Sequence, residues 1–197
     1  MPRIALFGTS ADPPHRGHAA ILTWLAQHFD YVAVWTAENP FKSCQTPLDN
    51  RFDMLQLMLD ELQLPPERIG LRRDLSHRWS IVSIERAQAC WPEAQLVLVI
   101  GSDLINQLPS WHRAKDILAA VEVLIVPRPG YPIMAESLAN LSRHTQVEIA
   151  STAELVDVAS SSCRQVDGRN HLTPAVRHYI SQHHLYQPSP QPLPRDF

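Results

Sequence analysis

The chain has few cysteines, no surplus of positive charge and no long apolar run. Its three cysteines, Cys44, Cys90 and Cys163, are odd in number and widely spaced, which argues against a disulfide framework and a zinc site. The formal net charge of −3 provides no overall basic field, so phosphates would have to be bound by locally placed groups. No apolar run reaches the roughly 18 residues of a membrane span, and no targeting segment is visible. We expect a cytoplasmic protein that binds neither nucleic acid nor membranes.

Short apolar stretches alternate with amphipathic ones along the chain. β-type runs are expected at residues 4–7, 31–36, 69–72, 96–100, 123–126 and 147–149. Helical spacing marks the intervening segments, as over residues 49–64, where Asp49 is a candidate N-cap. The alternation is typical of βαβ units and predicts an α/β protein with a doubly wound parallel sheet. Ligands of such sheets bind at the carboxyl ends of the strands.

The length of the chain favours one domain. Its 197 residues, 45% of them hydrophobic, can enclose one sizeable core but are few for two full domains. We expect a single domain over residues 1–187. Residues 188–197 contain four of the 17 prolines and little that could pack, so we expect an extended, Pro-rich C-terminal tail.

The loop over residues 8–18, Gly-Thr-Ser-Ala-Asp-Pro-Pro-His-Arg-Gly-His, follows the first strand and leads into a helix expected over residues 17–28. Gly8 allows a ligand to approach the backbone, and the helix N-terminus offers N–H donors to phosphate. His15 and His18 are spaced to point to one side. Either histidine alone would more simply be a surface or capping residue, and a metal site lacks a third ligand at a recognised spacing. Together these features predict a phosphate site.

This loop resembles the signature of the nucleotidyltransferase superfamily, G-G-x-F-D-P-x-H-x-G-H. Thr9 replaces the second glycine and Ala11 replaces the phenylalanine, while both histidines are present. The resemblance implies a Rossmann-like fold of the nucleotidyltransferase type with His15 and His18 as catalytic residues. It also implies that ATP contacts the first three residues of the loop, Gly8, Thr9 and Ser10.

Residues 99–104, Val-Ile-Gly-Ser-Asp-Leu, end a second buried strand. Gly101 followed by Asp103 could be an ordinary turn with a capping carboxylate, or a site where Asp103 accepts hydrogen bonds from the ribose of ATP. Trp111 comes shortly after and could pack a helix behind Ser110 or stack on an aromatic ligand. The alternatives are open on these residues alone.

This stretch and the Arg-Pro-Gly-Tyr run at residues 128–131 resemble the bacterial nicotinate mononucleotide adenylyltransferases. The resemblance implies that Trp111 stacks on the pyridine ring and that His112 and Arg128 belong to the same subsite. The Ser-Tyr-Thr segment of these enzymes is changed to Arg-Trp-Ser at residues 78–80. Ser80 is our candidate for contacting the substituent of the pyridine ring.

Two further segments are implied to bind the phosphates of ATP. Residues 158–164, Val-Ala-Ser-Ser-Ser-Cys-Arg, resemble the family's I-S-S-T-x-I-R motif, in which Ser161 and Arg164 would hold the β and γ phosphates. The resemblance thereby implies that Arg164 is a catalytic residue together with His15 and His18. Lys42 follows Phe41, which replaces a histidine of the family, and could reach pyrophosphate. Arg51 is either a second cation of this kind or a solvated surface charge.

The resemblance covers residues 3–186 and implies a reaction. The 5′-phosphate of nicotinate mononucleotide would attack the α-phosphorus of ATP, with Mg²⁺ on the leaving pyrophosphate, to give deamido-NAD in NAD biosynthesis. Nicotinamide mononucleotide is the alternative substrate, phosphopantetheine a more distant one, and a non-catalytic nucleotide-binding regulatory module the alternative of another class. A homo-oligomer is compatible with the sequence.

Overall fold

The structure, a computed structural model, describes residues 1–38, 45–151, 160–165 and 167–187. Its strands are β1 (Arg3–Thr9), β2 (Tyr31–Thr36), β3 (Ile69–Leu71), β4 (Gln95–Gly101), β5 (Glu122–Val126) and β6 (Val147–Ile149). Its α-helices are α1 (Arg16–His28), α2 (Leu48–Leu62), α3 (Ser80–Cys90), α4 (Ala114–Ala120), α5 (Ala135–Ser142), α6 (Ser160–Cys163) and α7 (Pro174–Gln182). Four 3-10 turns are η1 (Arg73–Leu75), η2 (Ser102–Leu104), η3 (Leu108–Ser110) and η4 (Asp167–His171).

The six strands form one parallel sheet in the order β3-β2-β1-β4-β5-β6. The expected doubly wound α/β fold is therefore confirmed, and all six expected strands are present. The order reverses between the central strands β1 and β4, so the loops that follow them diverge to opposite faces of the sheet. Such a reversal is where ligands of open α/β sheets bind.

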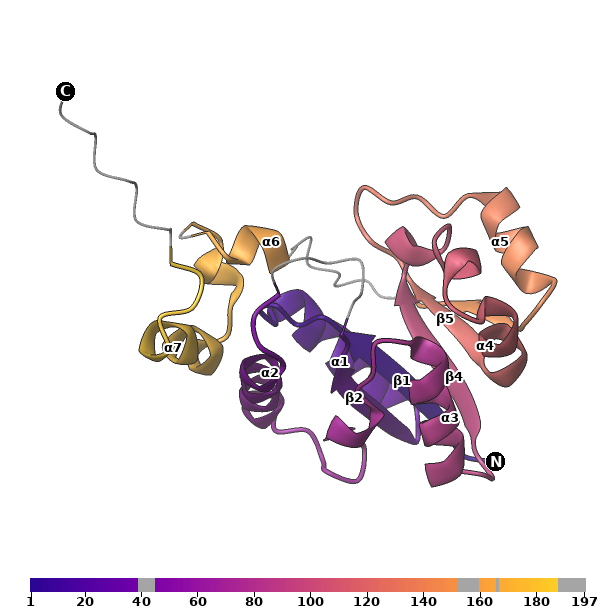
Figure 1. Cartoon of the computed structure of the whole chain (residues 1–197), viewed down its shortest axis with the longest axis horizontal. Helices are drawn as coiled ribbons and strands as arrows, with labels where there is room; N and C mark the ends of the chain where they lie inside the picture. The colour runs from indigo at the N-terminus through magenta and orange to yellow at the C-terminus, as the bar shows by residue number, and fades with distance from the viewer. Residues whose placement is uncertain (39–44, 152–159, 166, 188–197) are drawn as a thin grey trace.

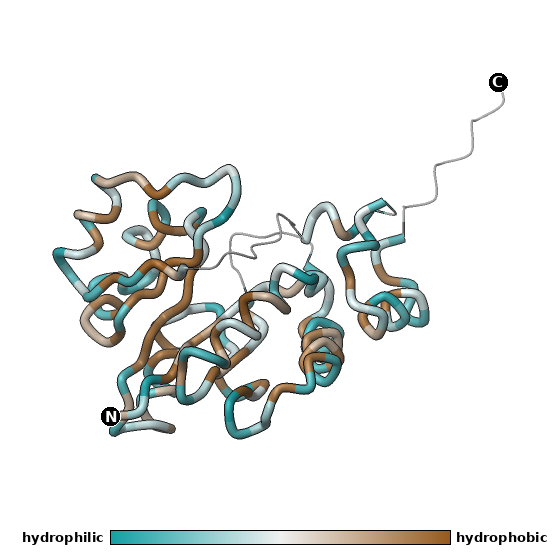
Figure 2. Tube along the Cα trace, turned by 180° about the vertical axis from the view of Figure 1, so that it is seen from behind, coloured by the Kyte–Doolittle hydropathy of each residue, from teal (hydrophilic) through white to brown (hydrophobic). Residues whose placement is uncertain are grey.

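Helices cover both faces of the sheet (Figure 1). Alternate residues of each strand point to opposite faces: Ala5 and Phe7 of β1 pack with α1, α2 and α7, whereas Ile4 and Leu6 pack with α3 and α4. Figure 2 shows the strands as a continuous apolar layer between more mixed helices. Burial on both faces explains why the strands read as unbroken apolar runs.

Two helix starts differ from the expectation. α2 begins at Leu48 behind Pro47, and Asp49 lies in its first turn without capping it. Ser110 does not start a helix either, because its hydroxyl donates backward to the Gln107 carbonyl at 2.7 Å. Trp111 is extended and Arg113 has a left-handed φ of 56°, so α4 begins only at Ala114.

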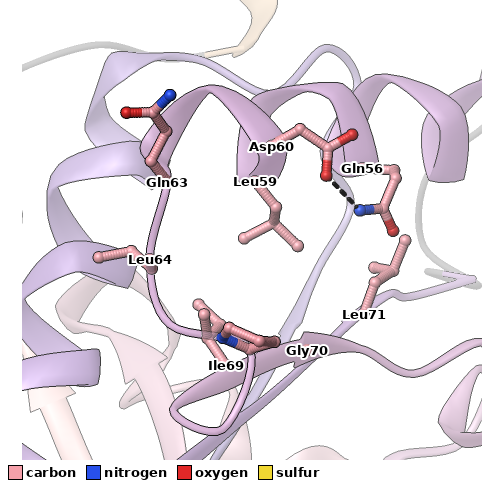
Figure 3. A pocket seen from close by; sticks show the side chains of 9 residues that line it. Gln56, Leu59, Asp60, Gln63, Leu64, Ile69, Gly70 and Leu71 are labelled. Carbon is pink, nitrogen blue, oxygen red and sulfur yellow. Dashed lines mark hydrogen bonds between the residues drawn. The ribbon is translucent and has the colours of Figure 1, made fainter.

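A pocket lies between the second half of α2 and strand β3 (Figure 3). Leu59 and Ile69 line its apolar part, while Gln56 donates to Asp60 at 2.8 Å. None of the residues that the sequence assigns to ATP or to the pyridine nucleotide is among the described residues lining it. Gly8 and Thr9 lie at the carboxyl end of β1 instead, and Gly101 lies at that of β4. Separately, no helix in the described part of the chain has the length and apolar character to span a membrane.

Candidate active site

His15 and His18 lie together at the start of α1, directly beyond β1. Their ring centroids are 3.9 Å apart, and each ring caps the helix. His15 Nδ1 accepts from the Gly17 N–H at 3.1 Å, and His18 Nδ1 accepts from the His15 N–H at 3.2 Å. Both histidines therefore cap the helix, and their rings also lie on one side of it. The two roles are compatible because capping uses only one nitrogen of each ring.

Capping also fixes which ring nitrogen donates. A ring that accepts at Nδ1 carries its proton at Nε2 when it is neutral. His15 and His18 therefore each carry an Nε2–H donor, and that of His18 lies 3.0 Å from the Thr9 hydroxyl oxygen. The Gly17 N–H, which the sequence suggested for phosphate, is already taken by His15. Donors for an anion at this helix start would come from the imidazoles.

The His15 ring is neutral at physiological pH. It is 6% exposed, and burial, with smaller contributions from the charges of Arg128 and His171, lowers its pKa from 6.5 to about 4. Desolvation disfavours the imidazolium form, and the neighbouring Arg128 cation does the same. His15 Nδ1 therefore keeps its lone pair and still accepts from the Gly17 N–H at pH values well below 7.

This shift predicts a pH dependence of stability. Because the folded pKa lies below the unfolded value, the stabilisation is present above pH 6.5 and is lost as the pH falls toward 4. At pH 5 the loss relative to pH 7 is about 2 kcal/mol. His15→Asn keeps an N-cap oxygen but cannot titrate, so its unfolding free energy should fall less between pH 7 and pH 5, by about that amount. Urea unfolding of both proteins at the two pH values measures the difference, and equal losses would contradict it.

Two glycines of the predicted ATP site make room for other side chains. A Cβ on Gly8 would lie 2.7 Å from the Trp35 ring, which packs across from it on β2. A Cβ on Gly101 would collide with the carboxylate of Asp103. Packing thus gives each position its own reason for glycine, independent of any approach by ATP.

Asp103 and Arg128, which the sequence placed in different subsites, form an ion pair. Arg128 Nη1 lies 2.9 Å from Asp103 Oδ2, and both side chains are partly exposed. Ser102 holds the geometry: its hydroxyl donates to the Tyr131 carbonyl at 2.8 Å and accepts from the Arg128 N–H at 2.9 Å. The loop after β5 is thereby fixed to the end of β4, and Arg128 lies near enough to influence His15.

Arg164 is tied to the first loop. Its Nη1 donates to the Asp12 carbonyl at 2.8 Å, and the Asp12 carboxylate lies 3.9 Å away. Asp12 is 5% exposed and accepts from the Tyr186 hydroxyl at 2.5 Å; burial and this bond raise the pKa of Tyr186. Ser161 is exposed on α6, three residues before Arg164. The C-terminal segment therefore contacts the loop after β1, through bonds that the sequence did not reveal.

The pyridine candidates come from two loops at the carboxyl edge. The Trp79 and His112 rings are 4.8 Å apart and tilted by 33°, which joins the segment before α3 to the segment after η3. Ser80 is the first residue of α3, and Trp111 is partly buried against the core. Sequence reasoning gave Trp79 no role; the aromatic residue in place of the family's tyrosine was the available signal.

Several other residues complete the account. Lys42 lies outside the described residues, so its expected contact with pyrophosphate is not tested. Ser10 lies in the first loop, where its carbonyl accepts from Arg51 Nη1 at 2.9 Å. Arg51 is 3% exposed, so it is not the solvated surface charge that one interpretation proposed. Sequence reasoning missed the structural roles of Ser102, Asp12 and Tyr186.

Comparison with known proteins identifies relatives along nearly the whole chain. A family model described as Cytidylyltransferase-like matches residues 6–166. A probable nicotinate-nucleotide adenylyltransferase of Synechocystis sp. is 42% identical over 94% of this chain and 99% of the relative. One of Solibacter usitatus is 31% identical over 93% of this chain and 99% of the relative.

A solved structure gives the same fold. The nicotinic acid mononucleotide adenylyltransferase of Plasmodium falciparum, complexed with NaAD, superposes with a TM-score of 0.79 over 94% of this chain and 98% of that chain. Its 17% identity limits this likeness to the fold. The family is shown by the family model, which matches most of the chain, and by the sequence identity to the bacterial relatives. The chain belongs to the nicotinate-nucleotide adenylyltransferase family, within the cytidylyltransferase-like proteins.

Proposed function

We propose that the chain transfers the adenylyl group of ATP to nicotinate mononucleotide, giving deamido-NAD and pyrophosphate. One observation carries the proposal: at the point where the sheet order reverses, the loop after β1 holds the His15 and His18 rings together and is contacted at Asp12 by Arg164. The names of the bacterial relatives supply the acceptor substrate. The reaction takes place in NAD biosynthesis, in the cytoplasm.

The chemistry needs no protein nucleophile. An oxygen of the 5′-phosphate attacks the α-phosphorus of ATP, the bond from that phosphorus to the bridging oxygen breaks, and pyrophosphate leaves with the bond electrons. Two anions must be aligned against their repulsion, and such positioning lowers a barrier by roughly 7 to 11 kcal/mol in favourable cases. We propose that His15 donates from Nε2 to an oxygen of the reacting phosphates, where charge develops, and that His18, whose Nε2 lies 3.0 Å from Thr9 Oγ1, acts at the same place.

The cationic and loop residues would bind the rest of ATP. Arg164 has a fork of donors of which Nη1 is used by Asp12, so we propose that the others, with Ser161, bind the β and γ phosphates. We propose that Gly8, Thr9, Ser10, Gly101 and Asp103 line the ATP site and that Lys42 reaches pyrophosphate. Mg²⁺ would accompany ATP and neutralise charge on the leaving group.

The pyridine nucleotide would bind beside the two aromatic loops. We propose that Trp111 stacks on the ring, with His112 and Ser80 near its substituent. Arg128 belongs to the boundary between the subsites, because it pairs with Asp103. A homo-oligomer remains compatible with this arrangement.

A pyrophosphate-release assay tests the proposal. Purified protein with ATP and Mg²⁺ is given nicotinate mononucleotide, nicotinamide mononucleotide or phosphopantetheine in parallel reactions. We expect release with the nicotinate form well above that with the other two. Preference for the amide would correct the substrate and point to residues 78–80 as the cause. No release with any acceptor, from protein that binds ATP, would favour the regulatory module.

Kinetics can test the role of Trp111 in binding the pyridine nucleotide. Trp111→Ala should chiefly raise the KM for the pyridine nucleotide, by roughly 10-fold, because stacking holds the ground state and the transition state alike. The KM for ATP should stay the same. Steady-state kinetics with each substrate varied provides the test, with Trp91→Ala at the far end of α3 as the control. An unchanged KM in the Trp111 variant would assign this ring to the core.

A further inference from the structure

Thr9 is the last residue of β1, and its backbone is held firmly. It is paired with Thr36 of β2, and its carbonyl accepts from the Ala37 N–H at 2.7 Å. The side chain is therefore presented at the carboxyl edge of a central strand, next to the point where the sheet order reverses. A glycine at this position, as in the family signature, would place no polar group there.

The Thr9 hydroxyl oxygen accepts from two donors. His18 Nε2 lies 3.0 Å from Oγ1, and the Ala11 N–H donates to the same oxygen at 3.3 Å. His18 is the donor in its pair, because its Nδ1 already accepts from the His15 N–H. A hydroxyl has two acceptor positions and one donor. Both acceptor positions are used, so the proton of Thr9 must point away from His18 and Ala11.

We propose that this hydroxyl donates to the reacting phosphate and thereby relays the hydrogen bond of His18. The inference rests on the proposed function. The relay runs from the His15 N–H to His18 Nδ1, from His18 Nε2–H to Thr9 Oγ1, and from the Thr9 O–H to a phosphate oxygen. Each bond polarises the next, so the final donor is stronger than an isolated hydroxyl. Thr9 thus becomes a catalytic residue through its side chain.

Thr9→Val tests the relay with the least disturbance. Valine has the same shape, suits a strand and removes only the hydroxyl, while Thr9→Ser keeps the hydroxyl as the matched control. We expect Thr9→Val to lower kcat by roughly 100- to 1,000-fold, as for the loss of one preorganised donor, with little change in the KM for ATP. Thr9→Ser should stay within about threefold of the wild type. Thermal unfolding of both variants checks that the strand is intact.

A purely structural role predicts the opposite result. If Thr9 merely holds the His18 ring, valine frees Nε2 to reach the phosphate directly, and kcat stays at or above the wild-type value. Such a result would overturn the relay. The double variant Thr9→Val, His18→Gln adds a second criterion, because two residues that act through one chain of hydrogen bonds together lose no more than the larger of the two single losses. Losses that multiply would show that the two residues act separately and would also overturn it.

The outcome for the wild type separates this inference from the proposed function. A wild type that forms no dinucleotide from ATP and nicotinate mononucleotide would overturn the proposed function together with the relay. A wild type that turns over, with Thr9→Val equal to it in kcat, would overturn the relay alone. An active wild type, an impaired valine variant and an active serine variant are the results that we expect.

Discussion

Replacement of His18 by alanine is expected to lower kcat by roughly 100- to 1,000-fold, the usual cost of one preorganised donor at a developing charge. Binding of ATP should weaken far less, because the contact strengthens as charge develops in the transition state. Single-turnover rates, measured beside ATP titrations, separate these effects. His28→Ala, which changes an exposed histidine at the other end of α1, is the control and should keep wild-type turnover.

The structural part of the His18 effect can be removed by a second variant. His18 caps α1 by accepting from the His15 N–H at 3.2 Å, so alanine also loses a cap worth about 1 kcal/mol. Glutamine at this helix position can reach back to the same N–H, as in a capping box. His18→Gln should therefore recover stability without recovering turnover. Wild-type kcat in either variant would end the catalytic assignment of His18.

The fold could be predicted from the sequence because burial on both faces leaves a clear pattern. A parallel strand covered by helices on each side has to be apolar throughout, and residues 96–100 show this as plainly as residues 123–126. Helix starts were harder to predict because they depend on one or two local bonds. Ser110 was expected to cap forward, yet its hydroxyl bonds backward to Gln107.

The location of the site was predictable for a similar reason, whereas its internal contacts were not. Motifs at the ends of β1 and β4 had to meet once those strands became neighbours in a parallel sheet. The hydrogen-bond partners of individual side chains could not be predicted. The Tyr186 hydroxyl donates to Asp12, which lies 174 positions earlier in the sequence, and Arg128 donates to Asp103. A local pattern carries no record of such pairs, because only the packed fold brings them within reach.

Arg51 illustrates how burial decides the importance of a charged residue. It is 3% exposed, and its guanidinium donates to three backbone carbonyls, those of Thr46, Ser10 and Ala37, each at 2.9 Å. Burial lowers the pKa of Arg51. The Ser10 carbonyl belongs to the loop after β1, the Ala37 carbonyl to the chain beyond β2 and the Thr46 carbonyl to the segment before α2. Arg51 thus joins three segments that are separate in the sequence.

Arg51→Ala is therefore expected to cost about 3 to 5 kcal/mol of unfolding free energy, because it leaves buried carbonyls without donors and opens a cavity. Arg73→Ala is the contrasting control: Arg73 forms two salt bridges, to Asp49 and Asp53, but all three side chains are exposed, and such pairs contribute about 0.2 to 1 kcal/mol. Urea unfolding should thus show a much larger loss of unfolding free energy for Arg51→Ala than for Arg73→Ala, although Arg51 forms no salt bridge among the described residues and Arg73 forms two. A smaller loss for Arg51→Ala than for Arg73→Ala would contradict the role of Arg51 in joining the three segments. Lost turnover in Arg51→Lys would show that the fork of donors, and not the charge, holds the Ser10 carbonyl in place.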